Sequence, residues 1–396
     1  MNAPAQVMLT RGLLAEVAEQ FGYPVPEELA TALGQVPRHH FLPETVWVRD
    51  GQGGYRPINR STDPGEWMAA AYADQTLVTQ FTDGLPTSSA SMPSMVLRML
   101  QLTKVTAPDG SRQQPFSVME LGTGTGFNAA LLCALLGQGA VTTVEVDAVL
   151  AEQGERNLKA AGYVPTVVQG DAARGYPGSA PFARVLATFS VDQIPLAWIA
   201  QTAPGGRIVT PWTSAWCCYG TLALTVSASG TAEGRFHDFA SFMPMRPSSE
   251  QDTANGAAAQ AIAAEEAKSA TELSPWAVAG GDLDAEFHLG LTVPGAFFSW
   301  DTTGEHAPVR LCVEDTTSTS WATVDYDGAN STEFTVTQAG PRQLWNEIAV
   351  AYASWEKSGR PDVDRHGLTV RADGRHSLWL DSPDRPLVDD RVLPPG

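Results

Sequence analysis

The chain contains few basic residues. It has 25 Lys and Arg against 44 Asp and Glu in 396 residues, which gives a formal net charge of -19 at pH 7. Such a surface repels the phosphates of nucleic acids and the anionic face of a membrane. We therefore expect neither as a partner. The same field attracts cationic ligands, but solubility explains the acidity equally well, so the charge says little about the substrate.

Cysteines and long apolar runs are also scarce. The four cysteines (Cys133, Cys217, Cys218 and Cys312) include no C-x-x-C pair, and adjacent Cys217 and Cys218 are poorly suited to a structural disulfide. The N-terminal segment MNAPAQVMLTRG has no basic stretch followed by an apolar run, and no apolar run is long enough to span a bilayer. These absences predict a cytoplasmic protein in a reducing compartment.

Metal-binding and hydrolytic motifs are missing too. The seven histidines lack the spacings of a zinc or iron centre. No G-x-S-x-G nucleophile elbow occurs. We expect no metal site and no hydrolase, and we interpret His39 and His40 as structural residues.

The first hundred residues combine helical patterns with polar stretches. Apolar residues recur at helical spacing from Leu13 to Phe21 and from Leu29 to Val36, which predicts two short helices. Segments 49–65 and 82–93 are rich in Gly, Pro and polar residues and are predicted to be loops. The second leads into an apolar run from Met95 that is typical of a helix, so it could present hydroxyl and N–H groups to an anion.

Strand-like and helical runs alternate from residue 116 to residue 212. The predicted strands are 116–121, 140–146, 165–170, 182–189 and 206–212, and the predicted helices are 127–137, 148–162 and 195–203. This alternation is typical of a parallel sheet with helices on both faces. The sequence therefore predicts a Rossmann-like α/β fold.

The composition changes after residue 247. With 43% hydrophobic and 17% charged residues, the chain can form two domains. The Ala-rich segment 248–275 is either a linker or an exposed helix and separates a catalytic domain, 1–247, from a C-terminal α+β domain, 276–396. The C-terminal domain holds six of the eleven tryptophans. It either covers the core structurally or binds a peptide through aromatic anchors.

The strongest local motif is VMELGTGTGFN, residues 118–128. Glu120 ends the predicted strand, and three glycines allow a backbone to approach a ligand closely. A dinucleotide-binding motif needs a third glycine where this chain has Phe127, which disfavours nicotinamide. Glycines at alternate positions, two residues after an acid, are instead arranged as in S-adenosylmethionine sites.

Two further acids lie at the ends of the next two predicted strands. Glu145 lies about twenty residues beyond the loop, where an acid can accept from ribose hydroxyls, and Asp171 could accept from an adenine amino group. The alternative interpretation is a tight strand-to-helix turn with ordinary surface acids. The predicted cofactor-binding residues are Glu120, Gly122, Thr123, Gly124, Thr125, Gly126, Asn128, Glu145, Val146, Asp171 and Ala172.

These motifs resemble those of protein-L-isoaspartate O-methyltransferases. The resemblance includes VMELGTGTGFNAALLCAL, NLKAAGY, GDA and IAQTAPGGRIVTPW, and upstream LATALGQVPRHHFLPE and SASMP, and it covers about residues 10–245. It implies that Ser91 holds the target carboxylate and that Ser89 replaces the neighbouring threonine of the substrate loop. A polar loop in which Ser91 caps the following helix is the alternative. Ala90, Met92, Phe189 and Asp192 depart from the family pattern.

The C-terminal segment 340–370 resembles the extension of relatives associated with ribosomally made, post-translationally modified peptides such as lanthipeptides, lasso peptides and graspetides. This resemblance implies an S-adenosylmethionine-dependent enzyme, with S-adenosylhomocysteine as product, that methylates an Asp side chain of a macrocyclic peptide, after which the ester closes to an aspartimide. The alternatives are repair of isoaspartyl residues in damaged proteins, methylation of a small-molecule carboxylate, and a scaffold that binds without catalysis. For the modified-peptide enzyme and for the repair enzyme, the partner is a peptide or protein bearing Asp or isoAsp.

Overall fold

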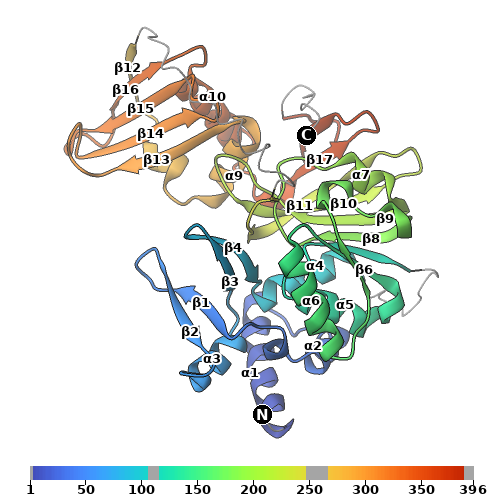
Figure 1. The fold of residues 1–396 in the computed structure, drawn as a ribbon. Coiled ribbons are helices and arrows are strands. Elements are labelled where there is room, and N and C mark those ends of the chain that lie inside the picture. Colours follow the sequence, from blue (N-terminus) through green and yellow to red (C-terminus); the bar gives the residue numbers. More distant parts are fainter. Residues whose placement is uncertain (1–2, 106–115, 247–265, 388–396) are drawn as a thin grey trace. The chain divides into compact units, whose positions relative to one another are not determined.

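The computed structural model describes residues 3–105, 116–246 and 266–387 (Figure 1). The chain divides into two units: unit 1 comprises Met1–Phe189, Pro195–Thr210 and Ala223–Ala232, and unit 2 comprises Ser190–Ile194, Pro211–Leu222 and Glu233–Gly396. These units differ from the predicted domains 1–247 and 276–396, because unit 2 includes Ser190–Ile194, Pro211–Leu222 and the residues from Glu233 onward. Residues 248–265 of the predicted linker lie outside the described residues, and its later part contains strand β12, Ala267–Thr271.

A nine-stranded sheet has the order β18-β17-β11-β10-β9-β8-β5-β6-β7. Its parallel part confirms the five predicted strands, which are β5 (Val118–Leu121), β6 (Val141–Glu145), β7 (Thr166–Gln169), β8 (Phe182–Ala187) and β9 (Thr202–Pro211). The remaining strands are β10 (Tyr219–Val226), β11 (Ala232–Ser241), β17 (His366–Val370) and β18 (His376–Leu380). The Rossmann-like fold class is confirmed.

The strand order has a switch point at β5. Strand β5 pairs in parallel with both β6 and β8, so the chain proceeds from β5 to one side of the sheet and later returns on the other side. Loops that leave the carboxyl ends of β5 and β8 therefore diverge. In open α/β sheets, ligands bind at this kind of topological switch point.

Three predicted helices connect these strands. They are α5 (Phe127–Leu136), α6 (Ala148–Ala160) and α7 (Leu196–Ala200). Helix α5 is apolar on nearly every side because it packs against α2, α6 and β6. Helix α6 has a buried face formed by Ala151, Gly154 and Leu158, and Asp147 caps its N-terminus by accepting from the N–H groups of Val149 and Leu150. The sequence periodicity thus predicted these helices correctly.

The N-terminal part of unit 1 corrects two predicted loops. Helices α1 (Ala3–Phe21) and α2 (Glu27–Gln35) are present as expected, although α1 begins earlier than its apolar pattern. A four-stranded antiparallel sheet has the order β2-β1-β3-β4, formed by β1 (Thr45–Arg49), β2 (Tyr55–Asn59), β3 (Leu77–Thr82) and β4 (Leu85–Ala90). Strand β2 and the start of α3 (Pro64–Ala71) lie within the predicted loop 49–65, and β4 forms half of the predicted loop 82–93.

A two-residue turn explains why the second loop prediction was wrong. Asp83 and Gly84 both have positive φ angles, of 52° and 79°, between the paired residues Thr82 and Leu85. Asp-Gly is a preferred sequence for a tight hairpin turn of this kind. The polar residues around it are therefore the exposed face of a hairpin, and helix α4 (Pro93–Thr103) follows as predicted.

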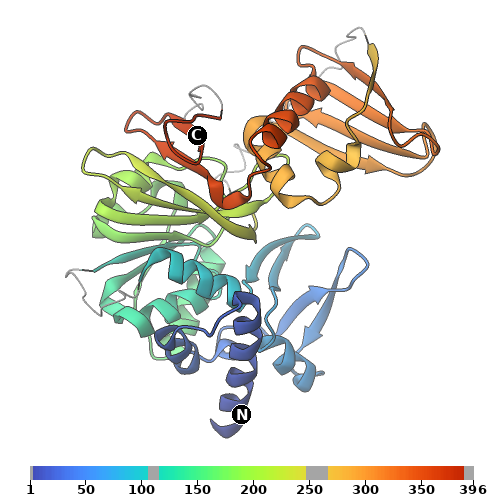
Figure 2. The same ribbon diagram turned by 180° about the vertical axis from the view of Figure 1, so that it is seen from behind.

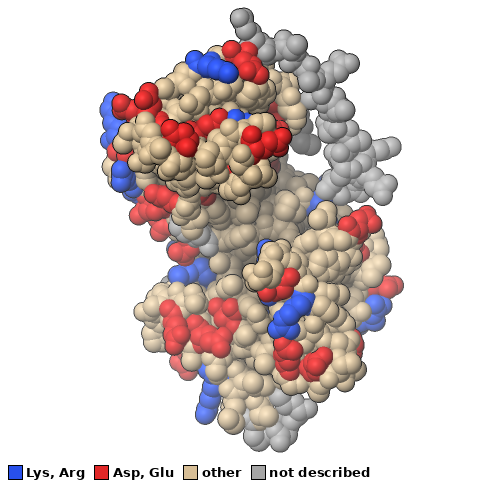
Figure 3. Space-filling model, turned by 90° about the vertical axis from the view of Figure 1, so that its left-hand side faces the viewer, with Lys and Arg blue, Asp and Glu red and all other residues tan. Residues whose placement is uncertain are grey.

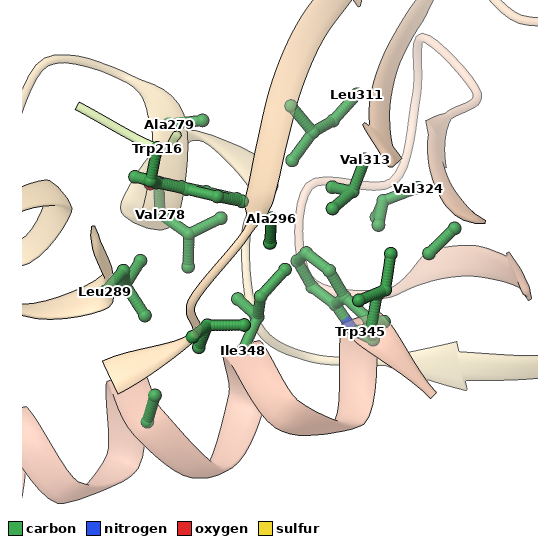
Figure 4. Packing of buried hydrophobic residues seen from close by; sticks show 14 of the residues in the cluster. Trp216, Val278, Ala279, Leu289, Ala296, Leu311, Val313, Val324, Trp345 and Ile348 are labelled. Atoms are coloured by element: carbon green, nitrogen blue, oxygen red, sulfur yellow. The ribbon is translucent and has the colours of Figure 1, made fainter. Parts of the chain in front are cut away.

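Unit 2 contains an antiparallel five-stranded sheet with the order β12-β16-β15-β14-β13. The strands of this sheet besides β12 are β13 (Ala296–Asp301), β14 (Val309–Asp315), β15 (Trp321–Tyr326) and β16 (Phe334–Ala339). Three helices of unit 2 are α8 (Pro275–Ala279), α9 (Leu283–Thr292) and α10 (Leu344–Lys357). Figure 2 shows α10 lying along the sheet, and it contacts β14, β15 and β16. The core between them includes Leu311, Val313, Val324, Trp345 and Ile348 (Figure 4). The expected α+β character is confirmed.

Helical membrane spans are absent from the described part of the chain, because none of its helices is both long enough and apolar enough to cross a bilayer.

Two histidines form a buried pair in unit 2. Nδ1 of His288 on α9 lies 3.0 Å from Nε2 of His366 on β17, and both side chains are fully buried. Nδ1 of His366 donates to the carbonyl of Asp362 at 2.9 Å, so its Nε2 accepts from His288. Burial lowers the pKa of His288 to about 3 and that of His366 to about 4. The pair is therefore neutral in the folded protein at neutral pH.

This pair predicts acid sensitivity of unit 2. A histidine pKa that is lowered in the folded state stabilises the fold at pH values above about 6.5, the histidine pKa in the unfolded chain. This stabilisation is lost as the pH falls towards 4. We expect urea unfolding to show a loss of roughly 2 kcal/mol or more between pH 7.5 and pH 5. The variant His288→Gln should lose less over this interval, whereas His306→Gln, at an exposed position, should behave as the wild type. An unchanged pH dependence in His288→Gln would contradict the assignment.

Candidate functional site

The glycine loop between β5 and α5 lies at the switch point. Gly122, Gly124 and Gly126 all have positive φ angles, of 95°, 50° and 86°. A Cβ atom on Gly122 would come within 2.5 Å of Oγ1 of Thr188, and one on Gly126 would come within 3.0 Å of the carbonyl oxygen of Gly154. These two glycines are therefore required by both the backbone conformation and the packing of the protein itself.

Gly124 differs from its neighbours because its Cβ direction is open. The nearest protein atom in that direction is Oγ of Ser88, at 3.9 Å from the Cβ position. The loop thus presents bare backbone to an open space, as a closely approaching ligand requires. This observation supports a ligand site at the predicted loop.

The residues after β8 hold the loop in place. Oγ1 of Thr188 donates to the carbonyls of Leu121 at 3.1 Å and Gly122 at 2.8 Å. The ring of Phe189 lies 3.2 Å from the Cβ position of Gly122. Sequence reasoning did not assign a role to Thr188, although its position at the end of a strand beside the switch point could have indicated one.

Glu145 connects the end of β6 to the glycine loop. Its Oε2 accepts from the N–H of Gly124 at 2.9 Å, and its Oε1 accepts from the N–H of Asp147 at 3.2 Å. The residue is buried, with only 5% of its surface exposed. The structure therefore places this predicted acid directly beside the open part of the loop.

Glu120 lies behind the loop within a buried hydrogen-bond network. Its Oε1 accepts from Nδ2 of Asn128 at 2.7 Å and its Oε2 accepts from Oγ1 of Thr143 at 2.6 Å. Oγ1 of Thr143 also lies 2.7 Å from Oγ1 of Thr123 in the loop. Because Glu120 is completely buried and both of its oxygens are engaged, it supports the loop through Thr143, which sequence reasoning missed.

The remaining predicted cofactor residues lie around this centre. Asp171 accepts from the N–H of Ala173 at 2.9 Å and retains 21% side-chain exposure. The carbonyl of Ala172 accepts from the indole of Trp198 at 2.7 Å, while that of Thr125 accepts from Asn157 at 2.9 Å. Val146 is partly exposed directly after β6. Each lies at the end of a parallel strand or in the loop itself, as the sequence predicted.

A hydrogen bond brings the β3–β4 hairpin to this edge of the sheet. Nε2 of Gln80 donates to Oδ2 of Asp147 at 3.2 Å, and Oγ1 of Thr87 donates to Oε1 of Gln80 at 2.8 Å. Asp147 also caps α6 and follows Glu145 by two residues. The hairpin that carries the predicted substrate serines is therefore joined to the part of the sheet that carries the predicted cofactor acid.

Arg38 fixes the backbone of the predicted substrate segment. This fully buried side chain donates to the carbonyls of Ser91 at 3.0 Å, Ala90 at 3.2 Å and Gln75 at 3.0 Å, and also to those of Ala71 and Ala73. Burial lowers the pKa of Arg38 to about 10, and Asp74 partly opposes this shift. The arginine of the VPR segment is thus a positioning residue that the sequence contained but did not explain.

Ser89 and Ser91 keep accessible hydroxyl groups. Both residues are partly exposed, and their side chains make no hydrogen bond within the described residues. The N-cap of α4 is Met92, without a side-chain capping bond, so the alternative interpretation of Ser91 as a helix cap is wrong. The segment combines a fixed backbone with free hydroxyls.

Metal-binding and basic features are weak in the described structure. Among the described residues, no cluster of His, Cys, Asp and Glu could hold a metal ion. Nδ1 of His39 lies 2.8 Å from the hydroxyl of Tyr72, in agreement with a structural role. Acidic side chains cover more of the face in Figure 3 than basic ones.

The buried Glu120 predicts a pH-dependent stability of unit 1. Burial raises the pKa of Glu120 to about 7, against the hydrogen bonds from Thr143 and Asn128. Its protonated form therefore stabilises the fold at low pH, and this contribution is lost as the pH rises through about 7. In the wild type, the free energy of unfolding should fall between pH 5 and pH 8.5 because of Glu120. In Glu120→Gln this fall should be smaller by up to about 3 kcal/mol, as measured by urea unfolding. The exposed variant Glu152→Gln serves as control, and parallel curves for Glu120→Gln and wild type would refute the prediction.

Comparison with known proteins identifies the family. The family model of protein-L-isoaspartate(D-aspartate) O-methyltransferase matches residues 56–217, which include every predicted site residue. The protein-L-isoaspartate O-methyltransferase of Methanosarcina mazei is 33% identical over 203 residues, covering 51% of this chain and 69% of the relative. That of Ignicoccus hospitalis is 32% identical over 205 residues, covering 51% of this chain and 79% of the relative.

A solved structure extends the likeness in fold. A protein-L-isoaspartate O-methyltransferase aligns with a TM-score of 0.54 and 18% identity over 95% of this chain and 100% of its own. The common fold therefore includes most of the C-terminal part, which lies beyond the residues that the family model matches. The family model and the relatives confirm the expected cofactor, S-adenosylmethionine. The chain therefore belongs to the protein-L-isoaspartate O-methyltransferase family of S-adenosylmethionine-dependent enzymes.

Proposed function

We propose that this enzyme methylates the free carboxylate of an isoaspartyl residue in a peptide or protein. The observation that carries the proposal is the segment at Ser91, whose carbonyl is fixed by buried Arg38 while its hydroxyl makes no bond within the described residues. The bond from Gln80 to Asp147 joins this hairpin to the edge that carries Glu145. A carboxylate acceptor and a methyl donor can therefore be held on adjoining elements, and family membership supports the same substrate class.

The residues at the switch point fit S-adenosylmethionine. The open side of Gly124 allows close approach of a ligand, and the carboxylates of Glu145 and Asp171 suit ribose hydroxyls, an amino group and a positive charge. Neither the loop nor these acids form a pyrophosphate site, because Phe127 replaces the required glycine. When bound, S-adenosylmethionine supplies an electrophilic methyl group on a positively charged sulfur.

The chain's own residues have an undemanding chemical task. A carboxyl group with a pKa of about 4 is ionised at neutral pH, so its methylation needs no strong general base. The protein must hold one carboxylate oxygen in line with the methyl carbon and exclude water. Hydroxyl donors such as Ser91 and Ser89 can orient the carboxylate without taking a proton from it. The site accordingly depends on positioned hydroxyls.

The resulting ester reacts further without help from the protein. The backbone nitrogen of the next residue attacks the ester carbonyl, a C–N bond forms, and methanol leaves with the nitrogen's proton. The product is a five-membered imide. Its hydrolysis can give an ordinary Asp, which would make the enzyme a repair enzyme.

A second candidate is methylation of an Asp side chain in a constrained, ribosomally made peptide. The packing of Phe189 favours it, because this ring lies beside Gly122 and 6.2 Å from the ring of Trp198, where the family has small residues. A bulky ring there would change the shape of the substrate site. The methyl ester of an Asp side chain closes to the same imide, which in this case would be the final product.

A three-substrate assay distinguishes the two candidates. The full-length enzyme is offered methyl-labelled S-adenosylmethionine with a linear isoaspartyl peptide, the same linear peptide with Asp, and that Asp peptide after macrocyclisation. We expect label on the isoaspartyl peptide, followed by release of labelled methanol. Label on the macrocyclic Asp peptide alone would replace the main proposal with the second candidate. Absence of label from all three peptides would contradict both.

Two variants separate the carboxylate site from the cofactor site. We expect Ser91→Ala to lower kcat/KM for the peptide about tenfold or more, because it removes a hydrogen bond to a charged group, while calorimetry finds unchanged affinity for S-adenosylhomocysteine. Glu145→Gln should weaken S-adenosylhomocysteine binding by a similar factor. Equal loss of cofactor affinity in both variants would contradict the role of Ser91, and full affinity in Glu145→Gln would contradict that of Glu145.

A further inference from the structure

Ser88 is a hydroxyl-bearing residue that belongs to neither the predicted catalytic set nor the predicted cofactor set. It lies on β4, one residue before Ser89, and is 7% exposed. We propose that Ser88 is a further catalytic residue, which donates a hydrogen bond to the carboxylate that accepts the methyl group. The proposal rests on the proposed function. It gives a substrate contact to Ser88, which has no role in the sites described above.

The position of Ser88 relative to the glycine loop is the first observation. Its Oγ is the single described protein atom within 4 Å of the Cβ position of Gly124, at 3.9 Å. The corresponding directions of Gly122 and Gly126 are filled by protein atoms at 3.2 Å or closer. Ser88 and the bare side of the loop therefore border the same space, which is where donor and acceptor must meet.

The direction of the hydrogen bond to Ser88 is the second observation. Oγ1 of Thr79 donates to Oγ of Ser88 at 3.2 Å. A serine hydroxyl has one hydrogen to donate, and Ser88 donates it to no other described residue. A buried hydroxyl whose donor capacity is unused favours a ligand acceptor, and a carboxylate oxygen is a strong one.

An irregularity in the hairpin brings these two hydroxyls together. Val78 pairs with Ser89 and Gln80 pairs with Ser88, so Thr79 is an extra residue on β3. A second shift follows at once, because Phe81 pairs with Pro86 and leaves Thr87 as an extra residue on β4. Such bulges redirect side chains and are frequent beside active sites. Gln80, the next residue, is anchored to Asp147. The bulge is thus held at the edge of the sheet, and Thr79 is a positioning residue for Ser88.

Two carboxylates could reach this space: the methyl acceptor and the amino-acid carboxylate of the cofactor. The acceptor is favoured because Ser88 belongs to the strand that continues into Ala90 and Ser91, whose carbonyls Arg38 fixes. By donating to one carboxylate oxygen, Ser88 would leave the other oxygen free to form the new bond to carbon. The serine keeps its proton throughout.

The test compares Ser88→Ala with the wild-type enzyme on the isoaspartyl peptide. We expect kcat/KM for the peptide to fall about tenfold to a hundredfold, as for loss of a hydrogen bond to a charged group. The dissociation constant of S-adenosylhomocysteine, measured by calorimetry, should stay unchanged, which also shows that the variant is folded. Ser88→Thr should recover part of the activity because it restores a hydroxyl.

Two further variants test the role of the hydroxyl pair. Thr79→Val removes the group that directs Ser88 while keeping a β-branched side chain, and we expect a smaller loss of kcat/KM than for Ser88→Ala. Thr82→Val changes an exposed hydroxyl on the same hairpin and should retain wild-type kinetics. These comparisons separate the carboxylate contact from general effects on the hairpin.

Different results overturn different statements. Normal kcat/KM in Ser88→Ala overturns this inference alone, provided that the wild-type enzyme methylates the peptide. Weaker binding of S-adenosylhomocysteine that accounts for the whole kinetic loss would place Ser88 at the cofactor carboxylate and would also overturn it. Absence of wild-type turnover overturns the proposed function and this inference together.

Discussion

A bare backbone bend must be held open at the carboxyl ends of β5 and β8, and the site depends on this constraint. The bend requires glycine at positions 122 and 126, because protein atoms occupy the space that a side chain would fill there. The loop is then fixed from three directions: Thr188 bonds its first carbonyls, Glu145 bonds the N–H of Gly124, and Thr143 reaches Thr123. The only loop glycine left open is Gly124. Rigidity of the surroundings therefore creates the exposed stretch of backbone.

Electrostatics around the loop follow from the same arrangement. Glu120 is so deeply buried that its pKa rises to about 7, and it is tolerated because Asn128 and Thr143 donate to both of its oxygens. Glu145 lies at the open side instead. The two carboxylates thus have separate tasks, since one supports the loop from behind and the other faces the region where a cation would bind. Similar residue types at successive strand ends need not have similar roles.

Beside the serines proposed to hold the methyl acceptor, a buried positive charge holds the backbone in place. A buried guanidinium is costly unless its donors are satisfied. In Arg38 the two terminal NH2 groups donate to carbonyls from the turn before β3 and from the end of β4, while Nε has no partner among the described residues. This interaction fixes the start of α4 and leaves the side chains of Ser89 and Ser91 free. The bulge at Thr79 adds a third hydroxyl, that of Ser88. Backbone anchoring and hydroxyl presentation are therefore divided between different residues, which suits a reaction that requires orientation more than proton transfer.

Local patterns in the sequence determined the parallel strands, their helices, the glycine loop and the acids Glu145 and Asp171. These features depend on periodicity, on backbone freedom at glycine and on the fact that parallel strands end at one edge of a sheet. The hairpin was missed because its polar residues were interpreted as a loop, although the Asp83–Gly84 turn was visible. The contacts of Ser88, Thr143, Thr188 and Arg38 and the burial of His288 beside His366 follow from the tertiary structure alone. Their partners are distant in the sequence, as with Thr188 and Gly122, and such contacts leave no periodic signal along the chain.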